Sequence, residues 1–475
     1  MFCLAARDDA AVLMVFLILI VLVAALIVGA VIWSYWVSIG REIRRHLRSN
    51  CKHAENVVKK LAGWDRVNHL QVLESLCQQS GGKRVTVAYL VENLQRMAVK
   101  GSTKSGPNWE TFASTKGKSI KLPTNAVYLI FHESHPVVAC VIAQASNEYY
   151  DDGIGDYTSS GPTGFRLEVL ALTRDIADAA LERIGDLVRE QSIYRGQTIL
   201  LRGDSKSGGD FAIEFSDIPN TTRDDIVLPE DLLHAIERNV IGFVTHTETL
   251  RKLGRSVKHG VLFFGPPGVG KTLVTRYLTK QCPKHTIVIL TGRNLHLLRE
   301  SMMFARLLTP SIVILEDVDL IANERSNNSQ VTVLQELLDE LDGLGAAVEC
   351  LVLMSTNRPD LLEPALAARP GRVDQTFELQ LPNADLRRRL CENYSKGLNT
   401  TAIDWTPWIE RTSGVSPAFI AEWLRRALLL AADRGEQLPD LKLQPNDLDE
   451  ALREITLYSG GLTQRLLGSS AARME

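Results

Sequence analysis

The chain has 475 residues, a length that allows two or three domains with separate hydrophobic cores. Its 56 acidic and 53 basic residues nearly balance, so the overall charge gives no argument for a nucleic-acid partner. The seven cysteines contain no CxxC pair, a pattern that favours free thiols over a disulfide framework or a zinc site.

The first predicted element is an apolar segment near the N-terminus. No charged residue occurs from position 10 to position 40, and about 20 helical residues are enough to cross the hydrocarbon core of a bilayer. A cleaved signal peptide would need a basic start, a shorter apolar core and a small-residue cleavage site, which do not fit this segment. We therefore expect an N-terminal flank at 1–9 and one retained transmembrane helix at 10–37.

A basic juxtamembrane segment is predicted at 38–54. By the positive-inside rule, its charge predicts a single-pass membrane protein whose C-terminal bulk lies in the cytoplasm or the mitochondrial matrix. A bacterial and a mitochondrial inner membrane fit this charge equally. Because no arginine-rich, acid-poor transit peptide precedes the apolar segment, the sequence favours the bacterial inner membrane. The cations of this segment are Arg41, Arg44, Arg45, Arg48 and Lys52.

Residues 55–225 are expected to form an accessory α+β domain. Apolar residues at helical spacing predict one long helix, from an N-cap at Thr173 to about Gln191. The fragment "HESH" at 132–135 has neither the spacing nor the helical context of a HExxH zinc site, so we expect no metal there. The predicted strands are 126–131, 137–144, 165–172, 197–201 and 211–215.

A phosphate-binding loop, "GPPGVGKT", lies between a predicted buried strand and a predicted helix. Its glycines allow backbone N–H groups to surround a phosphate at the start of the helix. In such a loop Lys271 contacts the β- and γ-phosphates, and the Thr272 hydroxyl is a ligand of Mg²⁺. The expected cofactors are therefore ATP and Mg²⁺. The predicted nucleotide-binding residues are Gly265, Pro266, Pro267, Gly268, Val269, Gly270, Lys271, Thr272 and Leu273.

Four motifs in this order resemble the AAA family of ATPases: "KLGRSVKHGVLFFGPPGVGKT", "SIVILEDVDLI", "VLMSTNRPDLLEPAL" and "RPGRVD". The resemblance covers about half of the chain. It implies an α/β P-loop core with a parallel sheet at 226–380, a helical lid at 381–460 and a C-terminal tail at 461–475. It also implies a ring-shaped homo-oligomer, usually a hexamer, with nucleotide sites at the subunit interfaces.

The resemblance also assigns roles around the γ-phosphate. Glu316 corresponds to the first acid of the pair that follows the second strand, which holds Mg²⁺ together with Thr272. Asp317 corresponds to the second acid, which polarises the attacking water. Asn357, at the end of "LVLMSTN", corresponds to the polar residue that orients this water.

Two arginines complete the site that the resemblance implies. Arg369 and Arg372 correspond to the paired arginines that reach the neighbouring subunit's nucleotide, where a guanidinium stabilises charge on the transferring phosphoryl group. From the residues alone, the other interpretation of this pair is a surface fork in a Pro-Gly turn.

The order of the two acids is reversed, because most ATPases with such a loop have Asp first and Glu second. An aspartate is shorter by one methylene, and a misplacement of about 1 Å can lower a rate on the order of 10²-fold. The reversed order also resembles one branch of the family, the mitochondrial inner-membrane translocases that help assemble respiratory complex III. In that branch the reversed order goes with activity, so we expect Asp317 to be a working catalytic residue.

These features predict a membrane-anchored AAA ATPase that remodels or translocates protein clients. The segment 290–317 lacks an aromatic-hydrophobic-Gly pore tripeptide, which disfavours threading of clients through a tight pore. The domain at 55–225 is the expected client or adaptor contact. An AAA protease is disfavoured because the sequence contains no HExxH motif. The alternative function is an ATP-gated membrane scaffold with little hydrolysis.

Overall fold

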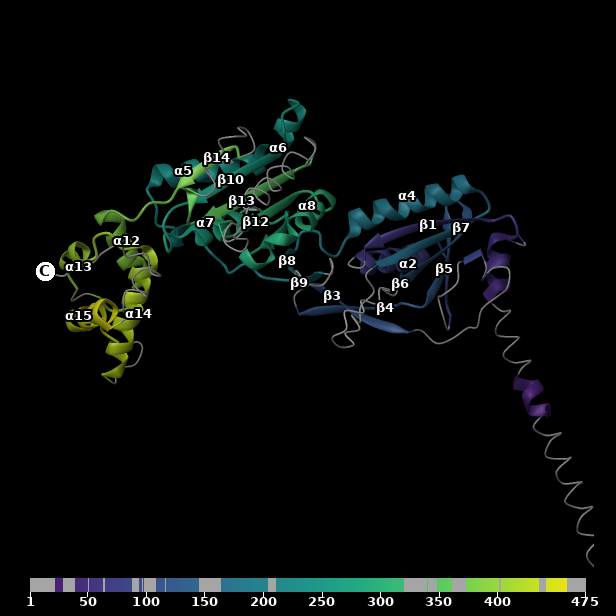
Figure 1. Cartoon of the computed structure of the whole chain (residues 1–475), viewed down its shortest axis with the longest axis horizontal. Helices are drawn as coiled ribbons and strands as arrows, with labels where there is room; N and C mark the ends of the chain where they lie inside the picture. Colours follow the sequence, from purple (N-terminus) through teal and green to yellow (C-terminus); the bar gives the residue numbers. More distant parts are fainter. Residues whose placement is uncertain are drawn as a thin grey trace, which may run out of the picture. The chain divides into compact units, whose positions relative to one another are not determined.

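The protein divides into two compact units, Met1–Ile193 and Tyr194–Glu475. Figure 1 shows both in a computed structural model of the whole chain. Every statement below refers to the described residues: 22–28, 39–49, 51–62, 65–87, 94–95, 97, 108–115, 117–144, 164–203, 211–319, 340, 348–360, 373–400, 403–434 and 441–458.

The first unit is built on a five-stranded antiparallel sheet with the order β1-β7-β6-β5-β2. Helices α2 (Arg66–Gln79) and α4 (Arg174–Gln191) contact each other and this sheet. Strands β3 and β4 form a separate two-stranded hairpin. The strands are β1 (Glu55–Ala62), β2 (Lys83–Thr86), β3 (Trp109–Thr115), β4 (Lys118–Pro123), β5 (Ala126–His132), β6 (His135–Gln144) and β7 (Gly164–Ala171).

Residues 39–47 of the predicted juxtamembrane segment are helical and belong to the core of this unit. Ile39, Ile43 and Leu47 are fully buried, and they share a hydrophobic cluster with Val127 and Leu129 of β5. Because the three helical residues recur at every fourth position, they lie on one face of the helix. The segment is therefore packed on the sheet through an apolar face.

The apolar segment ahead of this helix lies mostly outside the described residues. Residues 22–28 are helical and exposed. Among the residues that the structure describes, no helix is both long and apolar enough to cross a bilayer. The transmembrane helix at 10–37 therefore stays a prediction.

The second unit is built on a seven-stranded sheet with the order β14-β10-β13-β12-β11-β8-β9. Neighbouring strands are parallel except in the β8–β9 hairpin. Strands β12 and β13 are buried along their whole length, as is typical of parallel strands covered on both faces. The predicted α/β core with a parallel sheet is confirmed. The strands are β8 (Thr198–Gly203), β9 (Phe211–Phe215), β10 (Lys258–Phe264), β11 (Thr286–Leu290), β12 (Ser311–Leu315), β13 (Cys350–Thr356) and β14 (Gln375–Glu378).

Strands β8 and β9 correspond to two strands that the sequence predicts for the accessory domain at 55–225. Residues 198–200 of β8 instead pair in parallel with residues 287–289 of β11. The predicted boundary at 225 thus differs from the division of the chain, which falls between Ile193 and Tyr194. The reason is physical: a short apolar run predicts a strand, but its pairing partner is set by packing between distant segments.

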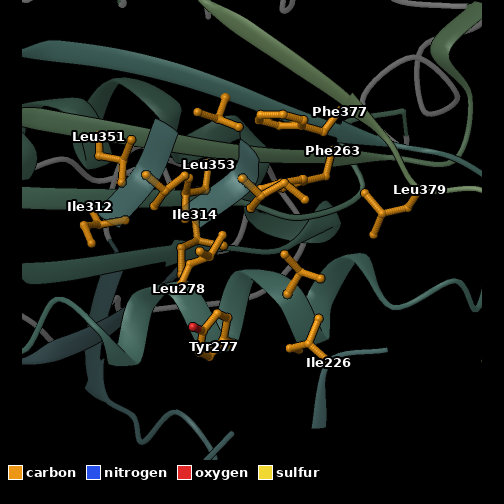
Figure 2. Close-up of a cluster of buried hydrophobic side chains, with 14 of the residues drawn as sticks. Ile226, Phe263, Tyr277, Leu278, Ile312, Ile314, Leu351, Leu353, Phe377 and Leu379 are labelled. Carbon is orange, nitrogen blue, oxygen red and sulfur yellow. The ribbon is translucent and has the colours of Figure 1, made fainter. Parts of the chain in front are cut away.

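The main core of the second unit lies between its sheet and helix α7. Figure 2 shows Phe263, Ile314 and Leu353 from neighbouring strands in the same cluster as Tyr277 and Leu278 of α7. The helices of this part are α5 (Glu230–Glu237), α6 (Phe243–Lys252), α7 (Lys271–Lys280) and α8 (Leu298–Leu307).

A helical cluster follows the last strand. Trp423 is fully buried there, and its indole N–H donates a hydrogen bond to the carbonyl of Leu448 at 2.9 Å. The pair ties α14 to α15 inside a separate hydrophobic cluster. The helices are α12 (Ala384–Tyr394), α13 (Thr406–Arg411), α14 (Pro417–Asp433) and α15 (Pro445–Arg453).

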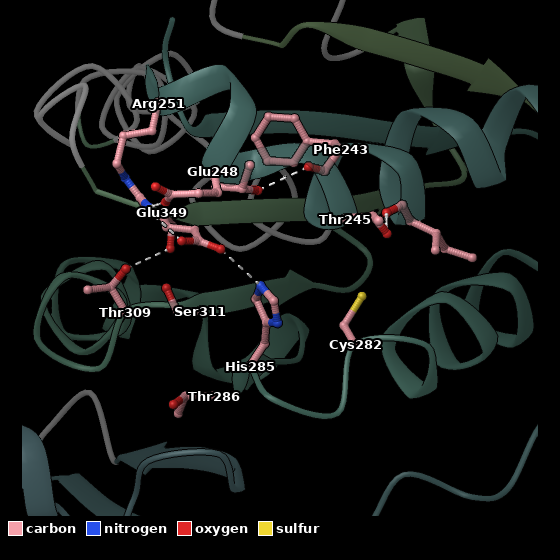
Figure 3. Close-up of polar contacts among 12 residues, drawn as sticks. Phe243, Thr245, Glu248, Arg251, Cys282, His285, Thr286, Thr309, Ser311 and Glu349 are labelled. Atoms are coloured by element: carbon pink, nitrogen blue, oxygen red, sulfur yellow. Dashed lines mark hydrogen bonds and ion pairs between the residues drawn. The ribbon is translucent and has the colours of Figure 1, made fainter. Parts of the chain in front are cut away.

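Glu349 joins several elements at the amino-terminal edge of the sheet (Figure 3). Its carboxylate accepts a hydrogen bond from Arg251 of α6 at 2.8 Å and lies 3.6 Å from His285. Its carbonyl accepts a hydrogen bond from the Thr309 hydroxyl at 3.0 Å. Burial lowers the pKa of His285, and the nearby Glu349 carboxylate opposes this shift. This junction lies at the edge opposite to the predicted phosphate-binding loop.

Candidate active site

The phosphate-binding loop connects the end of β10 to the start of α7. Gly265, Gly268 and Gly270 have φ angles of 142°, 78° and 102°, in the left-handed region that favours glycine. A Cβ atom at Gly265 would lie 2.1 Å from the carbonyl oxygen of Leu379. One at Gly268 would lie 2.8 Å from the Ser416 hydroxyl. Close packing and backbone conformation therefore both require glycine in this loop.

Lys271 is the first residue of α7, and its side chain turns back into the loop. The ammonium donates hydrogen bonds to the carbonyls of Gly265 and Pro266 at 2.7 and 2.8 Å, and to the Asn357 side-chain oxygen at 2.8 Å. Burial lowers the pKa of Lys271 to about 8, while the carboxylates of Asp317 and Asp319 act in the opposite direction. The lysine thus joins the loop to the end of β13.

The two reversed acids follow β12 and point to different partners. The Thr272 hydroxyl donates a hydrogen bond to the Glu316 carboxylate. Burial raises the pKa of Glu316, whereas this hydrogen bond and the charge of Arg276 lower it. Asp317 has a φ of 52°, and its carboxylate accepts a hydrogen bond from the Asn357 side-chain amide at 3.1 Å. The first acid therefore lies beside the predicted Mg²⁺ ligand, and the second beside the predicted water-orienting residue.

Asp319 is a third acid of this strand end, and the sequence pattern assigns it no role. It is buried, and one carboxylate oxygen accepts hydrogen bonds from the Thr356 hydroxyl at 2.9 Å and from the backbone N–H of Asn357 at 3.1 Å. These bonds hold the turn in which Asn357 stands. The only signal in the sequence is the spacing "EDVD", which places an acid two residues after Asp317.

A cavity of about 510 Å³ lies beside the loop, and Lys271, Asp317 and Asn357 are among the residues that line it. Residues 267–274, Asp317 and Asn357 line one part of it. Residues 225–228, with Leu390 and Tyr394 of α12, line another part, which is mainly apolar. A cavity of this size suits a drug-sized molecule. Because one part of its lining is polar and another is mainly apolar, it suits a molecule with one charged end and one apolar end.

The donor set fits ATP and Mg²⁺. A hydroxyl and a carboxylate in contact, Thr272 and Glu316, are oxygen ligands of the kind that Mg²⁺ prefers beside phosphates. The first N–H groups of α7 have no partner within the helix and attract an anion, as does the Lys271 ammonium. Residues 267–273 of the predicted loop line the cavity, and Gly265 and Pro266 contact Lys271. Arg369 and Arg372 lie outside the described residues.

The lowered pKa of Lys271 predicts a pH-dependent affinity. Phosphate attracts the protonated ammonium, so the affinity for ADP should be close to its maximum at pH 7 and should fall as the pH rises through about 8. At pH 9.5, about 1.5 units above the pKa, the affinity should be about 30-fold lower than at pH 7 if only the protonated form binds. Calorimetric titration with Mg²⁺-ADP measures this. The Lys271→Ala variant should bind weakly at every pH; an unchanged wild-type affinity up to pH 9.5 would contradict the role given to the ammonium.

Residues 261–381 match the family described as ATPase family associated with various cellular activities (AAA). The ATPase family gene 2 protein of Schizosaccharomyces pombe is 27% identical over 62% of this chain and 38% of its own length. The 26S proteasome regulatory subunit 8 homolog of the same organism is 34% identical over 42% of this chain and 54% of its own length.

A third relative, the ATP-dependent zinc metalloprotease FtsH 2 of Symbiobacterium thermophilum, is 29% identical over 46% of this chain and 39% of its own length. The chain thus spans between 38% and 54% of the length of these three relatives. The family match covers the glycine loop and five of the parallel strands, β10 to β14, in whole or in part, so the chain contains an AAA ATPase domain.

Proposed function

We propose that this protein is a membrane-anchored AAA ATPase that couples ATP hydrolysis to the remodelling or translocation of protein clients. The observation that carries the proposal is the convergence of Lys271, Asp317 and Asn357 beside the loop. Each of the three contacts at least one of the others, and all three line the same cavity. A phosphate-binding lysine and groups that orient the attacking water are among the recurring parts of sites that hydrolyse a phosphoanhydride.

In this proposal, the position of each residue in the site determines its role in hydrolysis. Lys271 and the N–H groups at the start of α7 hold the phosphates, and Thr272 with Glu316 would hold Mg²⁺. The ion, when bound, neutralises charge on the phosphate oxygens. Asp317 takes the proton of the attacking water, and Asn357 orients that water. The contacts of Asn357 with both Asp317 and Lys271 support this role for the reversed acid at the γ-phosphate end of the site.

The alternative function is an ATP-gated scaffold with little hydrolysis. Its support is the shorter side chain of Asp317, because base catalysis contributes roughly 10²–10⁴-fold and depends on reach. The observation that favours hydrolysis is the φ of 52° at Asp317, a backbone turn that goes with its contact to Asn357. Such a left-handed conformation is uncommon for a residue other than glycine and concentrates at functional sites.

A homo-oligomeric ring, with six subunits as the expected number, would complete the site. In this proposal Arg369 and Arg372 reach the nucleotide of the neighbouring subunit. Protein clients are supported by the names of two relatives, a proteasome regulatory subunit and a metalloprotease. The accessory domain predicted at 55–225 is the proposed client or adaptor contact, and no nucleic-acid partner is proposed.

A membrane location is proposed from the N-terminal region. The apolar segment 10–37 is directly followed by the helix 39–47, whose buried face packs on the sheet. Arg41, Arg45 and Arg48 are exposed on the remainder of this segment. This placement suits a domain that begins at the surface of an anionic bilayer. The proposed location is an inner membrane, bacterial in preference, with the ATPase on the cytoplasmic or matrix side.

The ring predicts that ATP turnover depends on assembly. Turnover per subunit should rise with protein concentration and reach a plateau. The Arg372→Ala variant should still bind ATP but lose at least about 10²-fold in turnover at the plateau, since trans arginines contribute 10³–10⁵ in related chemistry. A control variant, Arg411→Ala, removes an arginine that pairs with Asp449 in the helical cluster and should behave as wild type. Equal turnover by Arg372→Ala and wild type would reject the interface role.

The membrane helix predicts resistance to alkaline extraction. Full-length protein should remain in the membrane pellet after a carbonate wash. The Leu22→Arg variant should be retained less well, because an arginine at the centre of a spanning helix costs about 2.5–3.5 kcal/mol on insertion. Complete release of the wild-type chain by carbonate would exclude a spanning segment.

A further inference from the structure

One wall of the nucleotide cavity is a four-residue strap, Asp225–Leu228. Ile226 and Leu228 are buried in the core below the sheet, while Val227 packs against the helical cluster. An apolar wall of this kind suits the flat base of a nucleotide better than its phosphates. The position of the strap therefore determines the shape of the part of the cavity that lies away from the phosphate-binding loop.

Two sets of hydrogen bonds fix the residues that precede the strap. The Thr222 N–H and hydroxyl donate hydrogen bonds to the Asp225 carboxylate at 2.8 and 2.9 Å. The side-chain amide of Asn393, on α12, donates a hydrogen bond to the carbonyl of Asp224 at 3.1 Å. Hydrogen bonds thus connect the strap to the preceding turn, Arg223–Asp225, and connect this turn to helix α12.

A third connection runs from this turn to the helix of the phosphate-binding loop, through Glu237. This residue is the last of α5. One oxygen of its carboxylate accepts a hydrogen bond from the Arg223 guanidinium at 2.9 Å and one from the Tyr277 hydroxyl at 2.6 Å. The Arg223 guanidinium also pairs with Glu230, at the start of α5. Because Tyr277 is a buried residue of α7, Glu237 links the strap turn, α5 and α7 at one point.

Tyr277 stays a donor over the physiological pH range. Burial first, and then its hydrogen bond to Glu237, raise the pKa of the phenol to about 12. The Glu237 carboxylate is only 17% exposed, so water screens the contact weakly. A charged hydrogen bond in such surroundings is stronger than one between neutral groups.

We infer that Glu237 is a positioning residue that holds the base-side wall of the nucleotide cavity against α7, and so sets the affinity for the nucleoside part of the ligand. The inference rests on the proposed ATPase function. Glu237 acts through Arg223 and Tyr277 and touches no reacting atom. The phosphate end does not depend on it, because Lys271 is held by Gly265, Pro266 and Asn357.

The test compares the affinity for a whole nucleotide with the affinity for a ligand that has only phosphates. Wild type, Glu237→Gln and Tyr277→Phe are titrated in full-length form with Mg²⁺-ADP and, by competition, with inorganic tripolyphosphate. Both variants should bind ADP about tenfold more weakly, which corresponds to about 1.4 kcal/mol. Their affinity for tripolyphosphate should equal that of wild type. The KM for ATP should rise by a similar factor while kcat at saturating ATP stays unchanged.

A matched control is Glu349→Gln. That glutamate also joins an arginine and a second side chain from separate elements, but at the opposite edge of the sheet. It should leave both affinities unchanged, even if it lowers the unfolding temperature. The double variant Glu237→Gln/Tyr277→Phe should bind ADP no more weakly than the weaker single variant, because both changes break one connection.

Two results would overturn the inference. If Glu237→Gln loses ADP and tripolyphosphate in equal measure, the residue has only a general structural role. If it binds ADP as wild type does, the connection has no influence on the site. Failure of the wild-type chain to bind ADP or to hydrolyse ATP is a separate result, which would reject the proposed function itself.

Discussion

Three parallel strands end at the same edge of the sheet, and every group of the candidate site depends on this alignment. Phe264, the last residue of β10, lies opposite Thr356, the last residue of β13. Leu315, the last residue of β12, lies opposite Met354. The next residues along each strand are Gly265, Glu316 and Asn357, so the glycine loop, the acids and the polar residue emerge side by side. A shift of one residue in this register would reverse the faces of the side chains and separate them.

Within this frame, the buried ammonium of Lys271 joins the separate segments. Its hydrogen bonds to two loop carbonyls and to Asn357 connect the glycine loop with the end of β13. Asn357 in turn donates to Asp317, at the end of β12. Asp317, the second of the reversed acids, therefore belongs to the same hydrogen-bond network as Lys271, the lysine of the phosphate-binding loop. That network supports the proposal that Asp317 is the water-side acid, and the contact between Thr272 and Glu316 supports the proposal that Glu316 is the metal-side acid.

The glycine loop could be predicted from local spacing, and Glu316, Asp317 and Asn357 could be predicted from the family resemblance, whereas the connection through Glu237 could not be predicted. The glycine loop, its strand and its helix are consecutive, so spacing alone indicates them, and the loop indeed requires glycine at Gly265 and Gly268. The connection through Glu237 joins residues 14 and 40 positions away, which only the fold brings together. The same limit applies to β8, whose partner β11 lies far along the chain. The buried face of the helix 39–47 was not predicted, because the basic residues of this segment point first to a membrane flank.

The most direct test of a working site with reversed acids is single-turnover hydrolysis by assembled wild type and Asp317→Asn, with ATP affinity measured on the same samples. If Asp317 polarises the water, Asn at this position should leave ATP affinity nearly unchanged and lower the hydrolysis rate by roughly 10²–10⁴-fold. Equal rates in wild type and variant, whether both fast or both negligible, would contradict the catalytic role of Asp317. Negligible rates in both would leave the ATP-gated scaffold as the function of this chain.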